Sequence, residues 1–373
     1  MAGCATREPL GSFERGQREH PEHVSYIRNL RPYSADADHA AYSSLATVMR
    51  YWHVEAAPSV IKRAVAKYPA NLETEQKLKR FAENRRLWTH LDSPSPEKLA
   101  QLIHYKVPVI ARLNRNPFDP SSGYYVVIFG LDDLRQLILF YTGRKQAVAA
   151  SYNDFFRVWN SAGSLALAVC PPGFPSWKLD AGEHASRAVF YENDDRLKQA
   201  VSDYEAALNL GLRSSDLYLR LGNIYRKQGN PAAETMYRNA MAADVLNGAA
   251  YNNLAYLLAE HTNKLDESVR LARQAVLLDP ANPLALDTLG FALYQKAEYK
   301  EAAGVLEQAR GKARRYPANI QTEIAIRLAL TYLKSGQTHL VKQVLEDVHR
   351  LNPETALPQE LSEFGKDSAT DKN

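Results

Sequence analysis

Apolar residues are spaced in two different ways along this chain, and the spacing changes near residue 170. Before that point, helix-like stretches with an apolar side chain every three or four positions come first, and short apolar runs of strand length follow. The spacing predicts helices at 42–52, 59–67, 73–84, from 95 onwards and at 152–159, with strands at 108–113, 124–130, 137–141 and 165–170. Such an order of elements predicts an α+β domain over residues 23–170.

Polar, proline-rich and glycine-rich stretches flank this domain. Residues 171–182 open with Pro171, Pro172, Gly173 and Pro175, which can neither continue a strand nor begin a helix, so they predict a linker. Residues 1–22 are mostly polar and predict a flexible tether. The polar residues 357–373 predict a disordered tail.

A helical repeat occupies residues 183–356. Its clearest copy places Leu221 and Gly222 between Tyr218 and Tyr225, and small residues recur at roughly 34-residue intervals at Ala188, Gly222, Ala255, Gly290 and Ala329. Small residues allow two helices to approach closely, so the spacing predicts about five helical hairpins. The pattern resembles the tetratricopeptide repeat, and the resemblance implies an all-α superhelix that binds other proteins.

In that repeat family, the first helix of each hairpin lines a concave groove. The matching positions here are Asn223, Arg226, Asn253, Tyr256, Phe291 and Tyr294. An amide both donates and accepts hydrogen bonds, so Asn223 and Asn253 are expected to hold the backbone of an extended peptide. The alternative is that both asparagines are solvated or join neighbouring repeats.

The first domain resembles the bacteriocin-processing type of papain-fold cysteine peptidases. Residues 44–52 match the first helix of that family, Val107–Ala111 matches its Gly-x-Pro-Val-Ile strand, and Tyr124–Gly130 matches its His-Tyr-Val-Val strand. The resemblance spans residues 30–170 and implies a papain-like fold. A bacterial subgroup of the family joins this fold to tetratricopeptide repeats.

The catalytic positions implied by the resemblance hold residues that cannot perform the chemistry. They are Ala40 for the nucleophile, Tyr124 for the base, Tyr141 or Thr142 for the residue that orients the base, and Ser34 or Ala35 for the oxyanion glutamine. A methyl group cannot attack a carbonyl, and a tyrosine with a pKa near ~10 is a poor base at neutral pH. The resemblance therefore implies a pseudopeptidase and not an enzyme.

One group offers an alternative to the lost nucleophile. His39 could pair with Ser43 or Ser44, although Asp36 or Asp38 could instead cap the helix, with the serines packed on its first turn. Cys170 lies at the opposite end of the domain in sequence and does not replace the nucleophile. A cysteine-peptidase-like hydrolase with a substitute or misassigned site is thus the alternative to a non-catalytic adaptor or scaffold.

The composition limits which classes of binding partner we expect. Apolar residues make up 45% and charged residues 24% of the chain, with a formal net charge of +4. This charge is small for 373 residues, and we expect no nucleic-acid partner. No cofactor motif or metal-ligand spacing is recognised, so we expect neither a cofactor nor a metal. The expected partner is a protein or an extended peptide in the repeat groove.

The first residues resemble the end of a bacterial lipoprotein signal peptide. Ala2 and Gly3 precede Cys4, and a polar stretch follows. In such proteins the cysteine carries lipid, so Cys4 is the expected lipidation site if translation begins upstream of Met1. The protein would then be anchored to a membrane of the bacterial cell envelope by this lipid alone and would face the periplasm. Otherwise we expect it in the cytoplasm.

Overall fold

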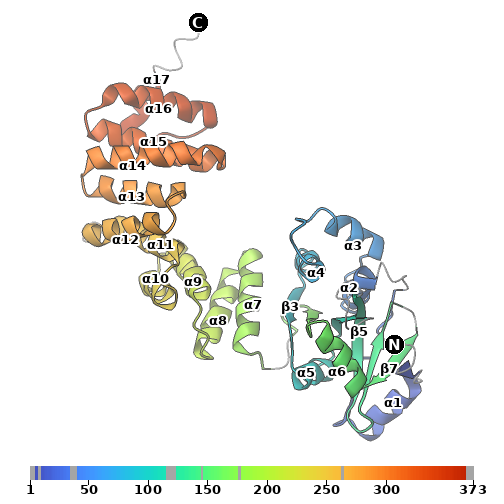
Figure 1. Ribbon diagram of the computed structural model, residues 1–373. Helices are drawn as coiled ribbons and strands as arrows, with labels where there is room; N and C mark the ends of the chain where they lie inside the picture. Colours follow the sequence, from blue (N-terminus) through green and yellow to red (C-terminus); the bar gives the residue numbers. More distant parts are fainter. Residues whose placement is uncertain are drawn as a thin grey trace. The chain divides into compact units, whose positions relative to one another are not determined.

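The computed structural model describes residues 5–6, 10–33, 40–114, 123–143, 146–174, 178–261 and 264–366. The chain divides into two compact units, Met1–Leu212 and Arg213–Asn373. Figure 1 labels the elements of both. Cys4, Ser34, Ala35 and His39 lie outside the described residues.

An antiparallel sheet of eight strands forms the centre of the first unit. Its order is β1-β7-β6-β5-β4-β8-β3, and β2 pairs with β5. The strands are β1 (Ala5–Thr6), β2 (Val24–Tyr26), β3 (Trp88–Asp92), β4 (Val109–Asn114), β5 (Gly123–Asp132), β6 (Leu137–Tyr141), β7 (Ala147–Ser151) and β8 (Ala166–Cys170). The predicted α+β class is present, but the strands are interspersed among the helices and do not simply follow them.

Eight helices accompany the sheet among the described residues of this unit. They are α1 (Leu10–Glu19), α2 (Ala40–Tyr51), α3 (Pro58–Val65), α4 (Thr74–Glu83), α5 (Pro96–His104), α6 (Tyr152–Ser161), α7 (Ala181–Asn193) and α8 (Leu197–Asn209). Helix α2 contacts β5, β4 and β8. Ser95 caps α5 by accepting a hydrogen bond from the Lys98 amide, and Pro96 occupies the first turn without losing a helical bond.

Helix α1 lies where the sequence predicted a flexible tether. Phe13 is completely buried, and the Tyr26 hydroxyl donates to Glu14 Oε1 at 2.9 Å. A Cβ on Gly16 would stand 3.3 Å from Val24, so the glycine allows α1 to lie close to β2. The buried Phe13 ring and the close contact at Gly16 together keep this segment ordered, although its composition is polar.

Helices α7 and α8 form the first repeat pair, and they belong to the same compact unit as the sheet. Helix α7 contacts β3. Lys98 of α5 donates to the buried Glu183 at 2.6 Å, and Arg187 forms two hydrogen bonds to Asp203 at 2.6 and 2.7 Å. The Tyr191 hydroxyl donates to the carbonyl of Pro172, so part of the predicted linker packs against the repeat.

The second unit contains four further helix pairs. They are α9 (Ser215–Lys227) with α10 (Ala232–Ala243), α11 (Gly248–Ala259) with α12 (Leu265–Leu278), α13 (Pro283–Gln295) with α14 (Tyr299–Lys312), and α15 (Ala318–Lys334) with α16 (Thr338–Leu351). Figure 1 shows these pairs stacked in chain order. Together with α7 and α8 they make the five predicted hairpins.

The small residues explain how each hairpin closes. A Cβ on Gly222 would stand 2.7 Å from the Tyr237 ring, and a Cβ on Gly290 would stand 2.4 Å from Leu306 Cγ. Ala188, Ala255 and Ala329 are completely buried. Only a very small side chain fits between the two helices at these positions.

The end of the chain is more ordered than predicted. A short 3-10 turn, η5 (Gln359–Leu361), precedes α17 (Ser362–Lys366), and Leu361 is completely buried beside Val344 and Val348 of α16. The predicted disordered tail therefore begins with a packed segment. Among the described helices, none is long and apolar enough to cross a membrane.

Candidate functional site

The first helices of the last four hairpins are α9, α11, α13 and α15. Each of them contacts the next one in chain order. The predicted groove residues lie on three of them: Asn223 and Arg226 on α9, Asn253 and Tyr256 on α11, and Phe291 and Tyr294 on α13. We call these six residues, together with Asn252, Asp287 and Arg327, the A-helix face. Arg226 is exposed, and most of the others are half-buried.

Hydrogen bonds join the asparagines of this face. Asn253 Nδ2 donates to Asn223 Oδ1 at 2.7 Å, and the Tyr237 hydroxyl donates to the same oxygen at 2.9 Å. Asn252 Nδ2 donates to Asn253 Oδ1 at 3.2 Å. Both predicted peptide-reading amides are thus joined to other side chains of the protein, as in the alternative that they link neighbouring repeats. Asn253 Oδ1 accepts one of these hydrogen bonds and has a second lone pair that can accept another.

Aromatic rings and guanidinium groups form the middle of the A-helix face. The rings of Tyr256 and Phe291 are 5.2 Å apart between centroids. The Arg226 guanidinium lies 5.4 Å from the Tyr256 ring, and that of Arg327 lies 4.6 Å from the Phe291 ring and 5.9 Å from the Tyr256 ring. These distances are within the range of cation–π attraction. The cluster fixes two aromatic surfaces on rigid helices.

Arg327 of α15 also donates a hydrogen bond to Asp287 Oδ2 of α13. Burial raises the pKa of Asp287 above its ordinary value, more than the nearby Arg327 lowers it. The other carboxyl oxygen, Asp287 Oδ1, and the amide oxygen of Asn252 are buried without a hydrogen-bond partner in the described part of the chain. Both oxygens would gain from a donor.

Sequence reasoning missed Arg327, although a signal for it exists. Asn253 lies two residues before the small residue Ala255, and it contacts Asn223, which follows Gly222 in the preceding repeat. Arg327 holds the same place two residues before Ala329, and it contacts Phe291, which follows Gly290. Comparing equivalent positions across repeats would therefore have placed Arg327 on this face.

Tyr294 is separated from the aromatic pair. Its ring contacts Tyr299 of α14 with centroids 5.5 Å apart. Burial raises the pKa of Tyr294 above its ordinary value, so the hydroxyl stays protonated at neutral pH. The structure brings Asn223 and Asn253 together, and Arg226, Tyr256 and Phe291 together, whereas Tyr294 sits against its own hairpin.

Three of the positions matched to the peptidase site lie in the described part of the sheet domain. Ala40 is buried at the start of α2. Tyr141 pairs with Val127 across β5 and β6 and stacks on Phe129 at 4.3 Å, so it faces the same side of the sheet as these two residues. Because side chains alternate along a strand, Tyr124 faces the opposite side. Of the two alternatives for the orienting residue, Tyr141 and Thr142, the former thus lies on the other side of the sheet from Tyr124.

The substitute nucleophiles are sequestered. Ser43 and Ser44 are buried in α2, and their hydroxyls have no hydrogen-bond partner among the residues that the structure describes. Cys170 is free and 1% exposed, and burial raises its thiol pKa to about 12. A thiol of this kind is almost wholly protonated at neutral pH and is a poor nucleophile. The described residues also contain no cluster of three His, Cys, Asp or Glu side chains suited to a metal.

A second concave feature was not predicted. A cavity of about 1200 Å³ lies in the first unit, between α1, the segment after β2, the C-terminal end of α2 and the residue Lys106 that follows α5. Among the described residues, four cationic side chains and one carboxylate line it: Arg28, Arg31, Arg50, Lys106 and Glu55. It lies away from Ala40, which is at the other end of α2.

Comparison with known proteins agrees with the repeat assignment. No protein-family model matches the chain. A TPR repeat-containing protein of Pseudomonas aeruginosa is 29% identical over 121 residues, or 32% of this chain, and the chain spans 19% of that relative's length. This similarity to a TPR protein covers about a third of the chain, and the structure shows five helix hairpins in the C-terminal half, where the sequence predicted them.

Two solved structures are also similar to part of this chain. YrrB, described as a TPR protein with an unusual peptide-binding site, is 20% identical with a TM-score of 0.41, over 50% of this chain and 92% of its own. MamA AMB-1 is 20% identical with a TM-score of 0.40, over 46% of this chain and 99% of its own.

Proposed function

We propose that this chain is a non-catalytic protein-binding scaffold whose A-helix face holds an extended segment of a partner. The observation that carries the proposal is the cluster of Tyr256 and Phe291 between two guanidinium groups. Tyrosine and arginine are enriched among the side chains that dominate the energetics of protein interfaces. Here Tyr256, Phe291 and Arg327 are half-buried on helices, and the exposed Arg226 lies over the Tyr256 ring.

The polar groups beside the cluster suit a peptide backbone. Asn223 and Asn253 are half-buried, and each amide nitrogen carries two hydrogens. Asn253 uses one of its two in the bond to Asn223, so amide hydrogens are left for carbonyl groups of the partner.

We also propose that the sheet domain is a papain-type peptidase fold without peptidase chemistry. The ordered resemblance over residues 30–170 supports this proposal, as does the alanine at the first position of α2. The hydrolase alternative is disfavoured by the buried positions of Ser43 and Ser44 and by the raised pKa of Cys170. Incubation of the full chain with unstructured peptides should therefore yield no cleavage products.

Lipid attachment at Cys4 stays a separate proposal, supported by the Ala-Gly-Cys sequence. Mass spectrometry of the N-terminal peptide of the protein from its native source tests it. Lipid on this cysteine would confirm the proposed envelope location, and an unmodified thiol would contradict it.

The binding proposal is tested by affinity capture with the full chain, followed by titration of the captured partner. Replacing both Tyr256 and Phe291 with alanine should weaken binding at least roughly thirtyfold, because two interface anchors are lost. Tyr316→Ala serves as the control, since Tyr316 is exposed and outside the A-helix face. If the double variant binds normally while Tyr124→Ala abolishes binding, the sheet domain and not the A-helix face is the binding surface.

A further inference from the structure

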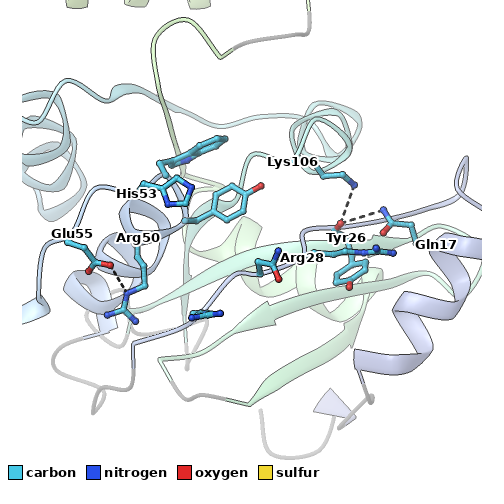
Figure 2. A pocket seen from close by; sticks show the side chains of 11 residues that line it. Gln17, Tyr26, Arg28, Arg50, His53, Glu55 and Lys106 are labelled. Atoms are coloured by element: carbon cyan, nitrogen blue, oxygen red, sulfur yellow. Dashed lines mark hydrogen bonds and ion pairs between the residues drawn. The ribbon is translucent and has the colours of Figure 1, made fainter.

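The cavity in the first unit has a strongly uneven distribution of charge. Figure 2 shows Arg28 and Lys106 on one side of it, beside Tyr26 and Gln17, and Arg50 with Glu55 on the other. The Tyr51 and Trp52 side chains also line the space. The indole nitrogen of Trp52 donates to the Val169 carbonyl at 2.6 Å, so this ring has a fixed position.

The single carboxylate of the lining is already engaged. Glu55 lies 3.5 Å from the Arg50 guanidinium and accepts a hydrogen bond from the Tyr33 hydroxyl at 3.1 Å. Arg50 also stacks over the Tyr33 ring at 3.4 Å. Among the residues that the structure describes, neither Arg28 nor Arg31 forms an ion pair, so the described lining of the cavity carries more positive than negative charge.

Lys106 shows the effect of this imbalance. Its ammonium donates to the Tyr26 carbonyl at 3.1 Å, and no carboxylate among the described residues lies within ion-pair distance. Burial and the nearby charge of Arg28 lower the pKa of Lys106. Two cations therefore face one concave space, and an anion between them would replace their repulsion with two attractive contacts.

We propose that this cavity binds a small phosphate-bearing anion with at least two phosphate groups. Arginine forms bidentate hydrogen bonds with phosphate oxygens, and lysine adds a compact charge, so Arg28 and Lys106 can share one phosphate. Arg31, on the same segment as Arg28, is the cation available to a second phosphate. A single phosphate would leave much of a cavity of about 1200 Å³ empty, and the Tyr51 and Trp52 rings offer surface for a further part of the ligand.

Calorimetric titration of the full chain with pyrophosphate and with ATP, at low ionic strength, tests the proposal. We expect saturable binding of pyrophosphate, and tighter binding of ATP if the aromatic wall takes the nucleoside. The Arg28→Gln, Lys106→Gln double variant should bind at least about tenfold more weakly, because two charge-assisted contacts are removed. The Lys198→Gln, Arg270→Gln variant loses the same charge at exposed sites elsewhere and should bind normally.

Three results would overturn the assignment. The first is the absence of saturable binding of either probe. The second is equal weakening in the two double variants, which would reflect net charge alone. The third is binding of citrate with no binding of pyrophosphate, which would assign the cavity to carboxylates. Should the Lys106 change disturb folding, Arg28→Gln alone decides the matter, because Arg28 is exposed and forms no ion pair in the described structure.

Discussion

Gly290 of α13 approaches Leu306 of α14 so closely that an added Cβ would stand 2.4 Å from Leu306 Cγ. Gly290→Ala should therefore force the two helices apart and lower the free energy of unfolding by about 1–3 kcal/mol. Gly304, also in α14, has open space around its Cα, so Gly304→Ala should stabilise the helix by up to about 1 kcal/mol. Circular dichroism of the helices during heating measures the midpoint of thermal unfolding. This midpoint should fall in Gly290→Ala and rise in Gly304→Ala, and a shift in the same direction in both variants would contradict the close-approach explanation.

The pair of Lys98 and Glu183 ties α5 to the first repeat helix. Glu183 is 1% exposed, so Lys98→Met leaves a buried carboxylate without its ammonium partner and should destabilise the first unit by about 3 kcal/mol. Combining it with Glu183→Gln removes the charge and keeps the hydrogen bond that caps α7. We expect the double variant to unfold at a higher temperature than Lys98→Met alone. Equal unfolding temperatures would mean that the ion pair contributes little.

The Arg327–Asp287 pair predicts a dependence on pH. Asp287 has a raised pKa in the folded state because it is buried, so folding favours its protonated form. The free energy of unfolding is not reduced by Asp287 at a pH below its unfolded pKa near ~3.9. It decreases as the pH rises from there through the raised pKa of Asp287 in the folded protein. Arg327→Met removes the compensating charge, so the variant should lose more stability at pH 7 than at pH 5. A loss independent of pH would assign the effect to packing of the arginine on Phe291.

Cys170 should resist alkylation in the folded protein. Its thiol is buried, and burial raises its pKa to about 12, so the thiol is almost wholly protonated at pH 8. A Cys4→Ser variant, in which Cys170 is the remaining cysteine, should incorporate iodoacetamide slowly in buffer and rapidly in denaturant. Rapid labelling of the folded chain would show that this thiol is accessible and would revive the hydrolase alternative.

Much of the fold could be predicted from the sequence because the relevant signals are local. The predicted helices and strands match α2 to α6, β4, β5, β6 and β8 within a few residues, and the small residues predicted every hairpin. Strand β3 was missed because Thr89 and His90 interrupt its apolar pattern, although Thr89 is buried. Strand β7 was missed because it is rich in alanine, which strands disfavour; its pairing with β6 determines its conformation.

The candidate sites could be predicted less completely from the sequence than the helices and strands. Residues on the A-helix face were found through their place in the repeat, yet the hydrogen bond between Asn223 and Asn253 depends on how two repeats stack. The basic cavity joins Arg28, Arg50 and Lys106 from three distant segments, and no spacing in the sequence relates them. Gln17 reaches the cavity only because α1 is folded.

Stacked repeats leave an apolar surface at each end of the array, and such ends ordinarily require a dedicated polar cap. In the first unit, α7 contacts β3 and is joined to α5 by Lys98 and Glu183, so the sheet domain covers one side of the first hairpin. In the second unit, Leu361 and α17 cover the surface of α16. A truncation within residues 171–182 would therefore expose the side of α7 that the sheet domain covers, whereas a cut after Leu212 follows the division between the compact units.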